Sequence, residues 1–528
     1  MEDVSRRRRA NTLLSILISA KKVLLRSFQA SHSENGEKNI SSASALLTYS
    51  DLPLQSSAFR TLDGYQKFFY SALLFLLGWA LWIDWHATVY VLIAMITVFY
   101  LCHFLFMLFL VVKSFLKEHE IVIAAQEVAD LSDASLPIYT IFCPLYKEWQ
   151  VLPQFLAAIN RLNWPKDKLD VELLLEQDDE ESIREIAKLD LPSYFRVMVV
   201  LESKPKTKPK ACNYGLRHAL GEYAVIYDAE DVPEPDQLKK AYLVFQKTAG
   251  TKIVCAQAKL DFYNVHQNVL TRLFALEYAL WFDLVLTGLQ SAGCPIPLGG
   301  TSNHFRTADL YRLNGWDVFN VTEDCDLGMR IAKAGNETII FNSTTYEEAN
   351  SQWGNWLRQR SRWIKGYIQT YFVHMRRPGE FFFGARLRSF FAFQLIVGGK
   401  IFALFANPFF WCLTLAYVLF RPLVGSTIES FYPLPILYAG VFALAFGNFL
   451  YLYYYVLGCL KRNKFDLVKY AVFVPFYWLM MSLAAWKALY QLIVKPHYWE
   501  KTLHGLHLGY RQADQVQVQA SVYESSSK

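Results

Sequence analysis

The apolar residues of this chain gather in two long regions that flank a stretch of mixed polarity, and this limits the possible folds more than any other feature. The first region covers residues 68–112 and the second runs from about residue 390 to 494. A helix needs about 20 apolar residues to cross the hydrocarbon core of a bilayer, and both regions exceed that length. The sequence therefore predicts a soluble domain inserted between two membrane regions.

The first apolar region contains a single polar break, at Asp84-Trp85-His86. The break separates Phe68–Ile83 from Ala87–Val112, so the region predicts a hairpin of two spans. A basic cluster, Arg6–Arg9, precedes the hairpin and Lys113 follows it. Because cytoplasmic flanks are enriched in lysine and arginine, both ends of the hairpin and the central domain are expected in the cytoplasm.

The second apolar region does not predict a definite number of crossings. Its segments are Phe390–Val424, interrupted at Asn407-Pro408, then Pro435–Gly458, and then Val468–Val494 with Pro475 inside it. Three simple crossings would put the residues after Val494 outside the cell. Two alternatives would keep them in the cytoplasm: either the first segment is a broken hairpin or an interfacial helix plus a span, or the last segment is not a full crossing.

In the soluble domain, short apolar runs alternate with helix-like stretches. The expected strands are Ile138–Pro144, Asp170–Glu176, Phe195–Leu201 and Glu222–Tyr227, and the stretches between them include Val151–Leu162 and Ala211–Leu220. Alternation of this kind predicts a parallel α/β sheet. In such sheets ligands bind beyond the carboxyl ends of the strands, so the residues at those ends are the candidates for a site.

Two acidic clusters follow predicted strands, Asp178-Asp179-Glu180 after the second and Asp228-Ala229-Glu230-Asp231 after the fourth. Either cluster alone could be a solvated turn. Together at equivalent strand ends they indicate Mg²⁺ or Mn²⁺ bound with a substrate diphosphate, because crowded carboxylates need a cation. Lys206, Lys208 and Lys210 precede a helix near the same edge, where Lys210 could hold a phosphate or be a surface lysine.

Two further motifs lie closer to the second membrane region. Thr322-Glu323-Asp324-Cys325-Asp326 places three acids before a helix-like stretch, and one of them could act as a general base toward a sugar hydroxyl. Gln359-Arg360-Ser361-Arg362-Trp363 combines an indole that can stack on a sugar with guanidinium groups that can hold phosphate. An interfacial membrane anchor is the alternative for this motif.

Over about residues 137–375, the order of these motifs resembles the inverting family-2 glycosyltransferases, in particular the processive membrane synthases of cellulose, hyaluronan and poly-N-acetylglucosamine. The resemblance rests on Pro144-Leu145-Tyr146-Lys147-Glu148, Asp178-Asp179, Lys208-Pro209-Lys210, Asp228-Ala229-Glu230-Asp231, Thr322-Glu323-Asp324 and Gln359-Arg360-Ser361-Arg362-Trp363. Beyond the second membrane region, Pro496-His497-Tyr498-Trp499-Glu500-Lys501-Thr502 resembles the family's gating segment. The implied fold is an α/β GT-A domain with a mostly parallel, Rossmann-like sheet, inserted between α-helical transmembrane regions.

The resemblance also implies roles for individual residues. It makes Asp324 the catalytic base and assigns acceptor binding to Glu323, Gln359 and Trp363, and gating to Trp499, Lys501 and Thr502. It assigns the nucleotide sugar to Pro144, Tyr146, Glu148, Asp178, Asp179, Lys210, Asp228 and Arg362. It places the metal, Mg²⁺ or Mn²⁺, at Asp228 with Glu230 or Asp231. The family usually has Asp-x-Asp here, so the presence of Glu230 leaves open which of the last two acids binds.

The expected organisation follows from the membrane pattern and the resemblance together. It comprises a partly disordered cytoplasmic segment at 1–66, a transmembrane hairpin at 67–115, a cytoplasmic GT-A domain at 120–385, membrane and interfacial helices forming a polymer channel at 386–494, a gating-like segment at 495–510 and a flexible tail at 511–528. We expect a multi-pass protein of the plasma membrane.

The expected function is processive, inverting hexosyl transfer from a UDP-sugar, with UDP-glucose and a β-glucan as first choice, and translocation of the polysaccharide. Expected partners are the donor, the growing polysaccharide, membrane lipids and secretion subunits. Nucleic acid is not expected, because the positive charges behind the net +6 lie at the N-terminus and beside membrane segments. The alternatives are non-processive transfer to a membrane lipid and a non-catalytic membrane scaffold.

Overall fold

The computed structural model describes residues 50–116, 120–383, 387–432, 434–502 and 505. The chain divides into two units, Met1–Asp51 and Leu52–Lys528, and all the described helices and strands belong to the second. Most of the N-terminal segment expected at 1–66, the gating-like segment beyond Thr502 except Gly505, and the tail at 511–528 lie outside the described residues. The last part of the 1–66 segment contacts the soluble domain, where Ser57 Oγ donates a hydrogen bond to Asp317 Oδ1 at 2.7 Å.

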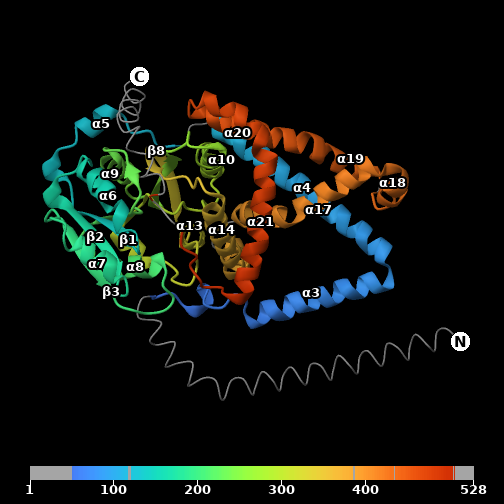
Figure 1. Cartoon of the computed structure of the whole chain (residues 1–528), viewed down its shortest axis with the longest axis horizontal. Coiled ribbons are helices and arrows are strands. Elements are labelled where there is room, and N and C mark those ends of the chain that lie inside the picture. The colour runs from blue at the N-terminus through green and yellow to red at the C-terminus, as the bar shows by residue number, and fades with distance from the viewer. Residues whose placement is uncertain (1–49, 117–119, 384–386, 433, 503–504, 506–528) are drawn as a thin grey trace, which may run out of the picture. The chain divides into compact units, whose positions relative to one another are not determined.

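An eight-stranded sheet forms the centre of the soluble domain, in the order β3-β2-β1-β4-β7-β6-β8-β5 (Figure 1). Its strands are β1 Tyr139–Leu145, β2 Leu169–Glu176, β3 Phe195–Val200, β4 Tyr223–Ile226, β5 Val232–Pro233, β6 Ile253–Phe262, β7 Asn303–Arg306 and β8 Glu337–Glu347. In the described part of the chain four strand pairings are parallel and three are antiparallel. The mixed, mostly parallel sheet expected of a GT-A domain is confirmed, and so are the four strands predicted from the sequence.

Helices cover both faces of this sheet, which is why its central strands read as nearly continuous apolar runs. Every residue of β2 is buried. On one face pack α6 (Leu152–Asn160) and α9 (Gln237–Lys247). On the other pack α8 (Lys208–Leu216) and α13 (Glu323–Lys333). The arrangement puts the carboxyl ends of β2, β1 and β4 side by side along one edge.

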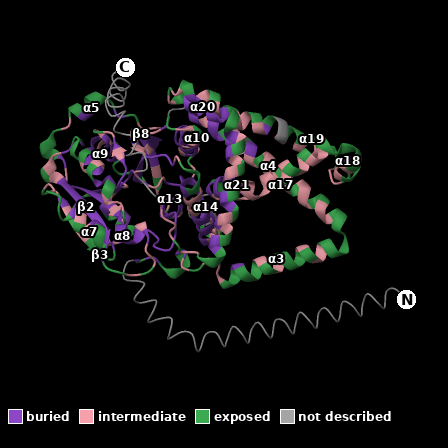
Figure 2. Ribbon diagram, viewed as in Figure 1, coloured by how far each residue is buried: buried purple, intermediate pink, exposed green. Residues whose placement is uncertain are grey.

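Four helices in the described residues are long and apolar enough to cross a membrane. They are α3 (Gly64–Ile83), α4 (Trp85–Leu116), the run of α16, η7 and α17 (Leu387–Leu419), and the run of η9 and α21 (Phe465–Val494). Figure 2 shows α3 largely exposed, and its exposed side chains include Phe68, Phe69, Leu73 and Leu74. Such a surface is unfavourable in water and suited to lipid. The two predicted spans are consecutive helices joined at Asp84, and their arrangement as a transmembrane hairpin stays a prediction.

The interruption expected at Asn407-Pro408 is wrong, because α17 (Gly399–Leu419) continues through Pro408. Proline is tolerated inside membrane helices where neighbouring groups satisfy the freed backbone. Here Tyr100 of α4 donates a hydrogen bond to Asn407 Oδ1 at 2.5 Å, tying the two helices together at this point. The irregularity lies earlier, in the π-helical turn η7 (Gln394–Gly398).

Both ends of α21 (Val474–Val494) meet the soluble domain. Ahead of it, Lys464 Nζ pairs with Asp261 Oδ1 of β6 at 2.5 Å. Behind it, Gln369 Nε2 of α14 (Trp353–His374) donates to Pro496 O at 3.0 Å. In Figure 1 α21 runs across α4 and α17 rather than alongside them. Which of the alternatives for the second apolar region holds stays a prediction, because the same run is also long and apolar enough to cross a membrane.

The chain returns toward the soluble domain before α21, through a broken helix. α18 (Arg421–Ser430) follows α17, and α19 (Leu434–Phe442), the π-turn η8 (Ala443–Gly447) and α20 (Asn448–Lys461) come next. At the end of α20, Lys461 Nζ donates to Asp283 O of the soluble domain at 3.0 Å. The basic residues of this connection therefore lie against the soluble domain.

Candidate active site

Two adjoining cavities lie at the carboxyl edge of the sheet. The strand-end cavity, of about 130 Å³, is bordered by the ends of β1, β2 and β4. The helix-side cavity, of about 150 Å³, extends from the same edge to α14, α17 and α21. Five residues line both cavities: Lys208, Asp228, Glu230, Arg362 and Trp499. The two cavities therefore form neighbouring parts of one site.

Carboxylates crowd the boundary between the cavities. Asp228 and Glu230 line both of them, and Glu347, at the end of β8, lines the helix-side cavity. Burial raises the pKa of Glu347 well above its usual range, and the negative charges of the other acids raise it further. The predicted acidic site is thus assembled at one edge, with Glu347 as a member that the sequence motifs did not indicate.

Asp231 is buried and lines neither of these cavities. Its Oδ2 accepts hydrogen bonds from the Asp228 backbone N–H at 2.7 Å and from the Thr301 hydroxyl. Burial raises the pKa of Asp231 well above its usual range, and Asp228 and Glu230 add to this. The structure thus brings Glu230, and not Asp231, to the wall of the site, and the role of each as a metal ligand stays a prediction.

Of the lysines around the start of α8, Lys208 faces the site. Its ammonium pairs with the Asp228 carboxylate, and its Nζ also donates to Gly300 O at 2.7 Å. Burial alone would lower the pKa of Lys208, but Asp228 and Glu323 raise it overall. Lys210 instead pairs with Glu176 Oε2 at 2.6 Å and is buried. The contact of Lys210 with the donor diphosphate stays a prediction, whereas Lys208, which was given no such role, lines both cavities.

Tyr146 connects the end of β1 to the acids after β2. It lines the strand-end cavity with Pro144 and Glu148. Its hydroxyl donates to Asp178 Oδ2 at 3.2 Å, and that carboxylate also pairs with Lys206 at 2.6 Å. Burial opposes ionisation of Asp178, but Lys206 and Tyr146 hold its pKa below the usual range. Asp178 is therefore a charged group beside this cavity.

Asp179 has a different environment from Asp178. It precedes α7 (Glu180–Ile186) as the N-cap, with Oδ1 accepting from Ser182 N at 3.3 Å and Oδ2 from Lys147 N at 2.5 Å. The Lys147 backbone has a positive φ of 55°, an uncommon conformation that this hydrogen bond stabilises. Asp179 thus shapes the loop after β1, and its predicted contact with the donor is untested.

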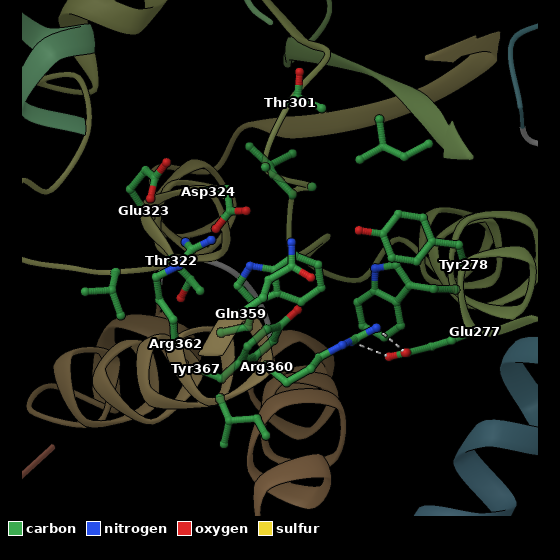
Figure 3. A pocket seen from close by; sticks show the side chains of 18 of the residues that line it. Glu277, Tyr278, Thr301, Thr322, Glu323, Asp324, Gln359, Arg360, Arg362 and Tyr367 are labelled. Atoms are coloured by element: carbon green, nitrogen blue, oxygen red, sulfur yellow. Dashed lines mark hydrogen bonds and ion pairs between the residues drawn. The ribbon is translucent and has the colours of Figure 1, made fainter. Parts of the chain in front are cut away.

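The two acids that begin α13 line the helix-side cavity (Figure 3). Burial raises the pKa of Asp324 to about 6, while the Cys325 N–H, Lys208 and Arg362 oppose that rise. Burial raises the pKa of Glu323 to about 8, and the charge of Asp324 raises it further. The pKa is thus raised further for Glu323 than for Asp324, which favours an ionised Asp324 near neutral pH, as a general base requires.

One face of α14 carries the amide, guanidinium and indole of the Gln-x-x-Arg-Trp motif. Gln359, Arg362 and Trp363 lie at helical spacings of three and four residues, and all three line the helix-side cavity. Gln359 Oε1 and Arg362 Nε are buried and have no hydrogen-bond partner among the described residues. Figure 3 shows Arg362 reaching toward Asp324. Unsatisfied polar atoms at a cavity wall are what a polar ligand would complete.

Arg360, within the same motif, also lines the helix-side cavity, but its guanidinium is paired with a carboxylate. Its Nη2 lies 2.6 Å from Glu277 Oε2 and its Nη1 lies 3.0 Å from Oε1. Nη2 also donates to the Tyr477 hydroxyl of α21 at 2.8 Å. Arg360 therefore joins the soluble domain to α21, and the two arginines of the motif have separate tasks.

The described part of the gating-like segment covers the boundary of the cavities. The Trp499 ring packs against the Arg362 guanidinium, 4.3 Å from ring centroid to Cζ. Lys501 donates to the carbonyls of Tyr146 and Lys147, and Thr502 lines the strand-end cavity. The segment 495–502 therefore joins α14 to the end of β1 across the site. Its role as a gate stays a prediction.

Comparison with known proteins identifies the family. Residues 223–486, half of the chain, match the family model "Glycosyl transferase family group 2". The probable glycosyltransferase YdaM of Bacillus subtilis is 27% identical over 261 residues, which cover 48% of this chain and 60% of that protein. The probable glucomannan 4-beta-mannosyltransferase 15 of Arabidopsis thaliana is 25% identical over 317 residues, which cover 57% of this chain and 58% of that protein. The chain thus spans less than two thirds of these relatives.

Among solved structures, a mannosyltransferase from Pyrobaculum calidifontis, in complex with GDP-Man and Mn²⁺, aligns with a TM-score of 0.46 at 19% identity, over 76% of this chain and 98% of that one. The family assignment rests on the sequence match, which includes the acids after β4, the Asp324 motif and α14. The chain belongs to the family-2 glycosyltransferases.

Proposed function

We propose that this protein is a membrane-embedded, inverting hexosyltransferase that extends a polysaccharide from a nucleoside-diphosphate hexose. One observation carries the proposal: Asp324, the Gln359, Arg362 and Trp363 face of α14, and the Lys208–Asp228 pair line a single cavity. A base, a set of sugar contacts and charges for a diphosphate are thereby placed around one volume. A non-catalytic scaffold would have no use for such buried, unsatisfied groups.

The proposed reaction is a single displacement. Asp324 removes the proton from an acceptor hydroxyl as its oxygen attacks the anomeric carbon, and the bond from that carbon to the diphosphate oxygen breaks. Glu323, protonated near neutral pH, can donate a hydrogen bond to the acceptor. Attack from the face opposite the nucleotide converts an α-linked donor into a β-linked product.

The leaving diphosphate gains negative charge, which nearby cations would stabilise. Lys208 and Arg362 both line the boundary of the cavities, so their charges can act where the bond to the diphosphate breaks. Trp499 packs against Arg362 and limits the freedom of its guanidinium. Tyr146, which lines the strand-end cavity, and its partner Asp178 would contact the nucleoside end of the donor.

Asp228 and Glu230 fit a divalent cation that takes its other oxygens from the diphosphate and water. No group of three or more His, Cys, Asp or Glu side chains in the described part of the chain is arranged to hold a metal by itself. Two carboxylates with substrate phosphates are nevertheless a usual set for Mg²⁺, and the mutual repulsion of the acids here calls for a cation. When bound, such an ion would neutralise charge on the leaving diphosphate.

Replacing each of the two neighbouring acids by its amide, in separate variants, tests whether Glu230 is the metal ligand. Glu230→Gln should raise the Mn²⁺ concentration for half-maximal activity by about 10- to 100-fold, because it removes a ligand. Asp231→Asn, the matched control, should leave that concentration unchanged and lower the midpoint of thermal unfolding, because its carboxylate only receives protein hydrogen bonds. A metal requirement that shifts with Asp231→Asn and not with Glu230→Gln would reverse the assignment.

Chain elongation is favoured over a single transfer by the extent of the site. The helix-side cavity continues to Ile401, Leu404 and Met481 of the membrane-facing helices. A polymer leaving Asp324 would meet this region next. The segment 495–502, held to the end of β1 by Lys501, provides a cover over the donor side. Transfer to a membrane lipid remains the alternative, since the same path could admit a lipid.

We place the soluble domain in the cytoplasm and the chain in the plasma membrane. Lys113 lies in the last turn of α4. Lys461 ends α20, and Arg462 and Lys464 follow it on the side of the soluble domain, as the positive-inside rule favours. If α21 lies on the soluble domain, the number of crossings is even. The crossing elements would be α3, α4, the run ending in α17, and the broken helix α19–α20. An even number keeps the segment 495–502 on the catalytic side.

A panel of donors tests the function. Membranes containing the full chain would be incubated with Mn²⁺ or Mg²⁺ and radiolabelled GDP-mannose, UDP-glucose or UDP-N-acetylglucosamine. The names of the plant relatives favour GDP-mannose, while UDP-glucose stays the prediction from the sequence. We expect nucleotide release and a high-molecular-weight product with one donor. A short, organic-soluble product would favour the lipid acceptor, and the absence of nucleotide release with every donor would contradict the proposal.

A further inference from the structure

One end of the helix-side cavity contains a positive charge from a membrane helix. Lys400, near the start of α17, lines the cavity together with Ile401 and Leu404 of the same helix. Asp324 lies at the other end, and Figure 3 shows the Glu277–Arg360 pair across the cavity from it. Apart from the Glu277–Arg360 pair, the residues that line the cavity near Lys400 include the aromatic Trp281 and Tyr367 and the apolar Ile401 and Leu404. A lysine inside an apolar helix is costly to bury, so its placement calls for an explanation.

The nearby carboxylate is already matched by another cation. The Glu277 carboxylate accepts hydrogen bonds from two nitrogens of Arg360, at 2.6 and 3.0 Å. The Tyr477 hydroxyl also donates to it, at 2.7 Å. A paired arrangement of this kind neutralises the Glu277 charge. Among the described residues Lys400 forms no ion pair or hydrogen bond, so its ammonium is a surplus charge at this end of the cavity.

Aromatic rings hold the Lys400 ammonium in place without neutralising it. Its Nζ lies 4.7 Å from the centroid of the Trp281 ring and 5.3 Å from that of Tyr367. Ring faces attract a cation but carry no net charge. The ammonium is therefore oriented, and its charge is left for a ligand in the cavity.

The local backbone supports a functional role for this position. Trp281 begins one π-helical turn, Trp281–Val285, and Lys400 comes just after another, Gln394–Gly398. Such turns often occur at functional sites. Glycine at 398 and 399 allows close packing, since a Cβ there would lie 2.9 Å from the Tyr371 ring and 2.8 Å from His103, respectively. The start of α17 is thus pressed between α14 and α4, where Lys400 meets the cavity.

We propose that Lys400 binds an anionic oxygen group of the acceptor, a carboxylate or a phosphate, and so makes the enzyme selective for acidic acceptors. This inference rests on the proposed function, because it treats the helix-side cavity as the acceptor site. The acceptor hydroxyl would lie at Asp324 and the acidic group at Lys400. The acidic group could belong to a uronic acid sugar or to a lipid phosphate.

Matched pairs of small ligands test the charge preference directly. Binding to the full chain in detergent would be measured by calorimetry for methyl β-glucuronide against methyl β-glucoside, and for farnesyl phosphate against farnesol. We expect at least one anionic member to bind about tenfold more tightly than its neutral partner. Preference within the sugar pair identifies an acidic sugar as the source, and preference within the lipid pair identifies a lipid phosphate.

Two variants assign that preference to Lys400. Lys400→Met should remove it by weakening only the anionic ligand, and Lys400→Arg should retain it. Equal affinities within both pairs in the unmodified protein would overturn the inference, as would a preference that survives in Lys400→Met. If Lys400→Met does not fold, Lys400→Gln takes its place, and the comparison in the unmodified protein is decisive on its own.

The binding measurement also separates this inference from the proposed function. Nucleotide release from the donor panel would be followed in the same preparations. A charge preference that depends on Lys400 without any nucleotide release would contradict the transferase and leave the binding site standing. Nucleotide release without a charge preference would support the transferase and overturn the binding role of Lys400.

Discussion

Replacing Asp324 with asparagine is expected to lower kcat by about 10³-fold. The carboxamide has nearly the same shape as the carboxylate but cannot accept the proton of the acceptor hydroxyl. Donor affinity should change little, because Lys208, Asp228 and Arg362 remain in place around the diphosphate. Turnover would be measured by nucleotide release, and donor affinity by calorimetry on the same preparation. Transfer at an undiminished rate in Asp324→Asn would eliminate Asp324 as the base.

The pH dependence of the unmodified enzyme provides a second check on this base. A general base acts only when ionised, and burial raises the pKa of Asp324 to about 6. As the pH falls below that value, Asp324 becomes protonated, so kcat/KM should fall by about tenfold per pH unit. Above it, Asp324 stays ionised and this fall should be absent. A kcat/KM that stays constant down to pH values near 4, the range of an ordinary aspartate, would contradict the raised pKa.

The edge of the sheet where the site forms could be predicted, because the apolar strands and the acidic residues that follow them are both visible in the sequence. β1, β2 and β4 are short, apolar and parallel, so the residues that follow them meet at one edge. Asp178 and Asp228 were predicted to meet there for this reason. Glu347 was missed because it ends β8, whose long polar and β-branched sequence predicts no position within the sheet.

The direction in which each side chain points could not be predicted from the motifs. Lys208 and Lys210 are two residues apart in the first turn of α8, so they lie about 200° apart around the helix axis. One of them must face away from any site on that side, and the sequence contains no signal for which. The same applies to Glu230 and Asp231, which are adjacent in a turn. In each pair the direction of one side chain is fixed by a residue far away in the sequence: Lys210 pairs with Glu176, and Asp231 accepts a hydrogen bond from Thr301.

The path of the last membrane segments also depended on long-range contacts. The composition of α21 suits a membrane span, and only the ion pair from Lys464 to Asp261 and the hydrogen bond from Gln369 to Pro496 O show that both its ends meet the soluble domain. Apolar length is thus a necessary feature of a span, and it does not distinguish a crossing helix from one that lies between the soluble domain and lipid.

The two arginines of the α14 motif should respond to substitution in opposite ways. Arg360→Met should lower the free energy of unfolding by about 3 kcal/mol, because it leaves the largely buried Glu277 carboxylate without the guanidinium that is hydrogen-bonded to it. The Tyr477 hydroxyl would lose a donor at the same time, so the contact between α14 and α21 should loosen. Thermal unfolding in detergent would measure the effect. Glu277→Gln in the same background should recover part of the stability, since it removes the unpaired charge.

Arg362→Met is the matched control, because it removes a guanidinium from the same helix by the same substitution. Arg362 lines both cavities and packs against the uncharged Trp499 ring, and it forms no ion pair among the described residues. Its loss should therefore spare the unfolding midpoint and lower kcat by about 10²-fold, as expected when one group that stabilises transition-state charge is removed. If Arg360→Met instead reduced turnover at full stability while Arg362→Met unfolded the protein, the division between a structural and a catalytic arginine in α14 would be wrong. The expected result would show that one five-residue motif serves the chemistry with one arginine and the attachment of α21 with the other.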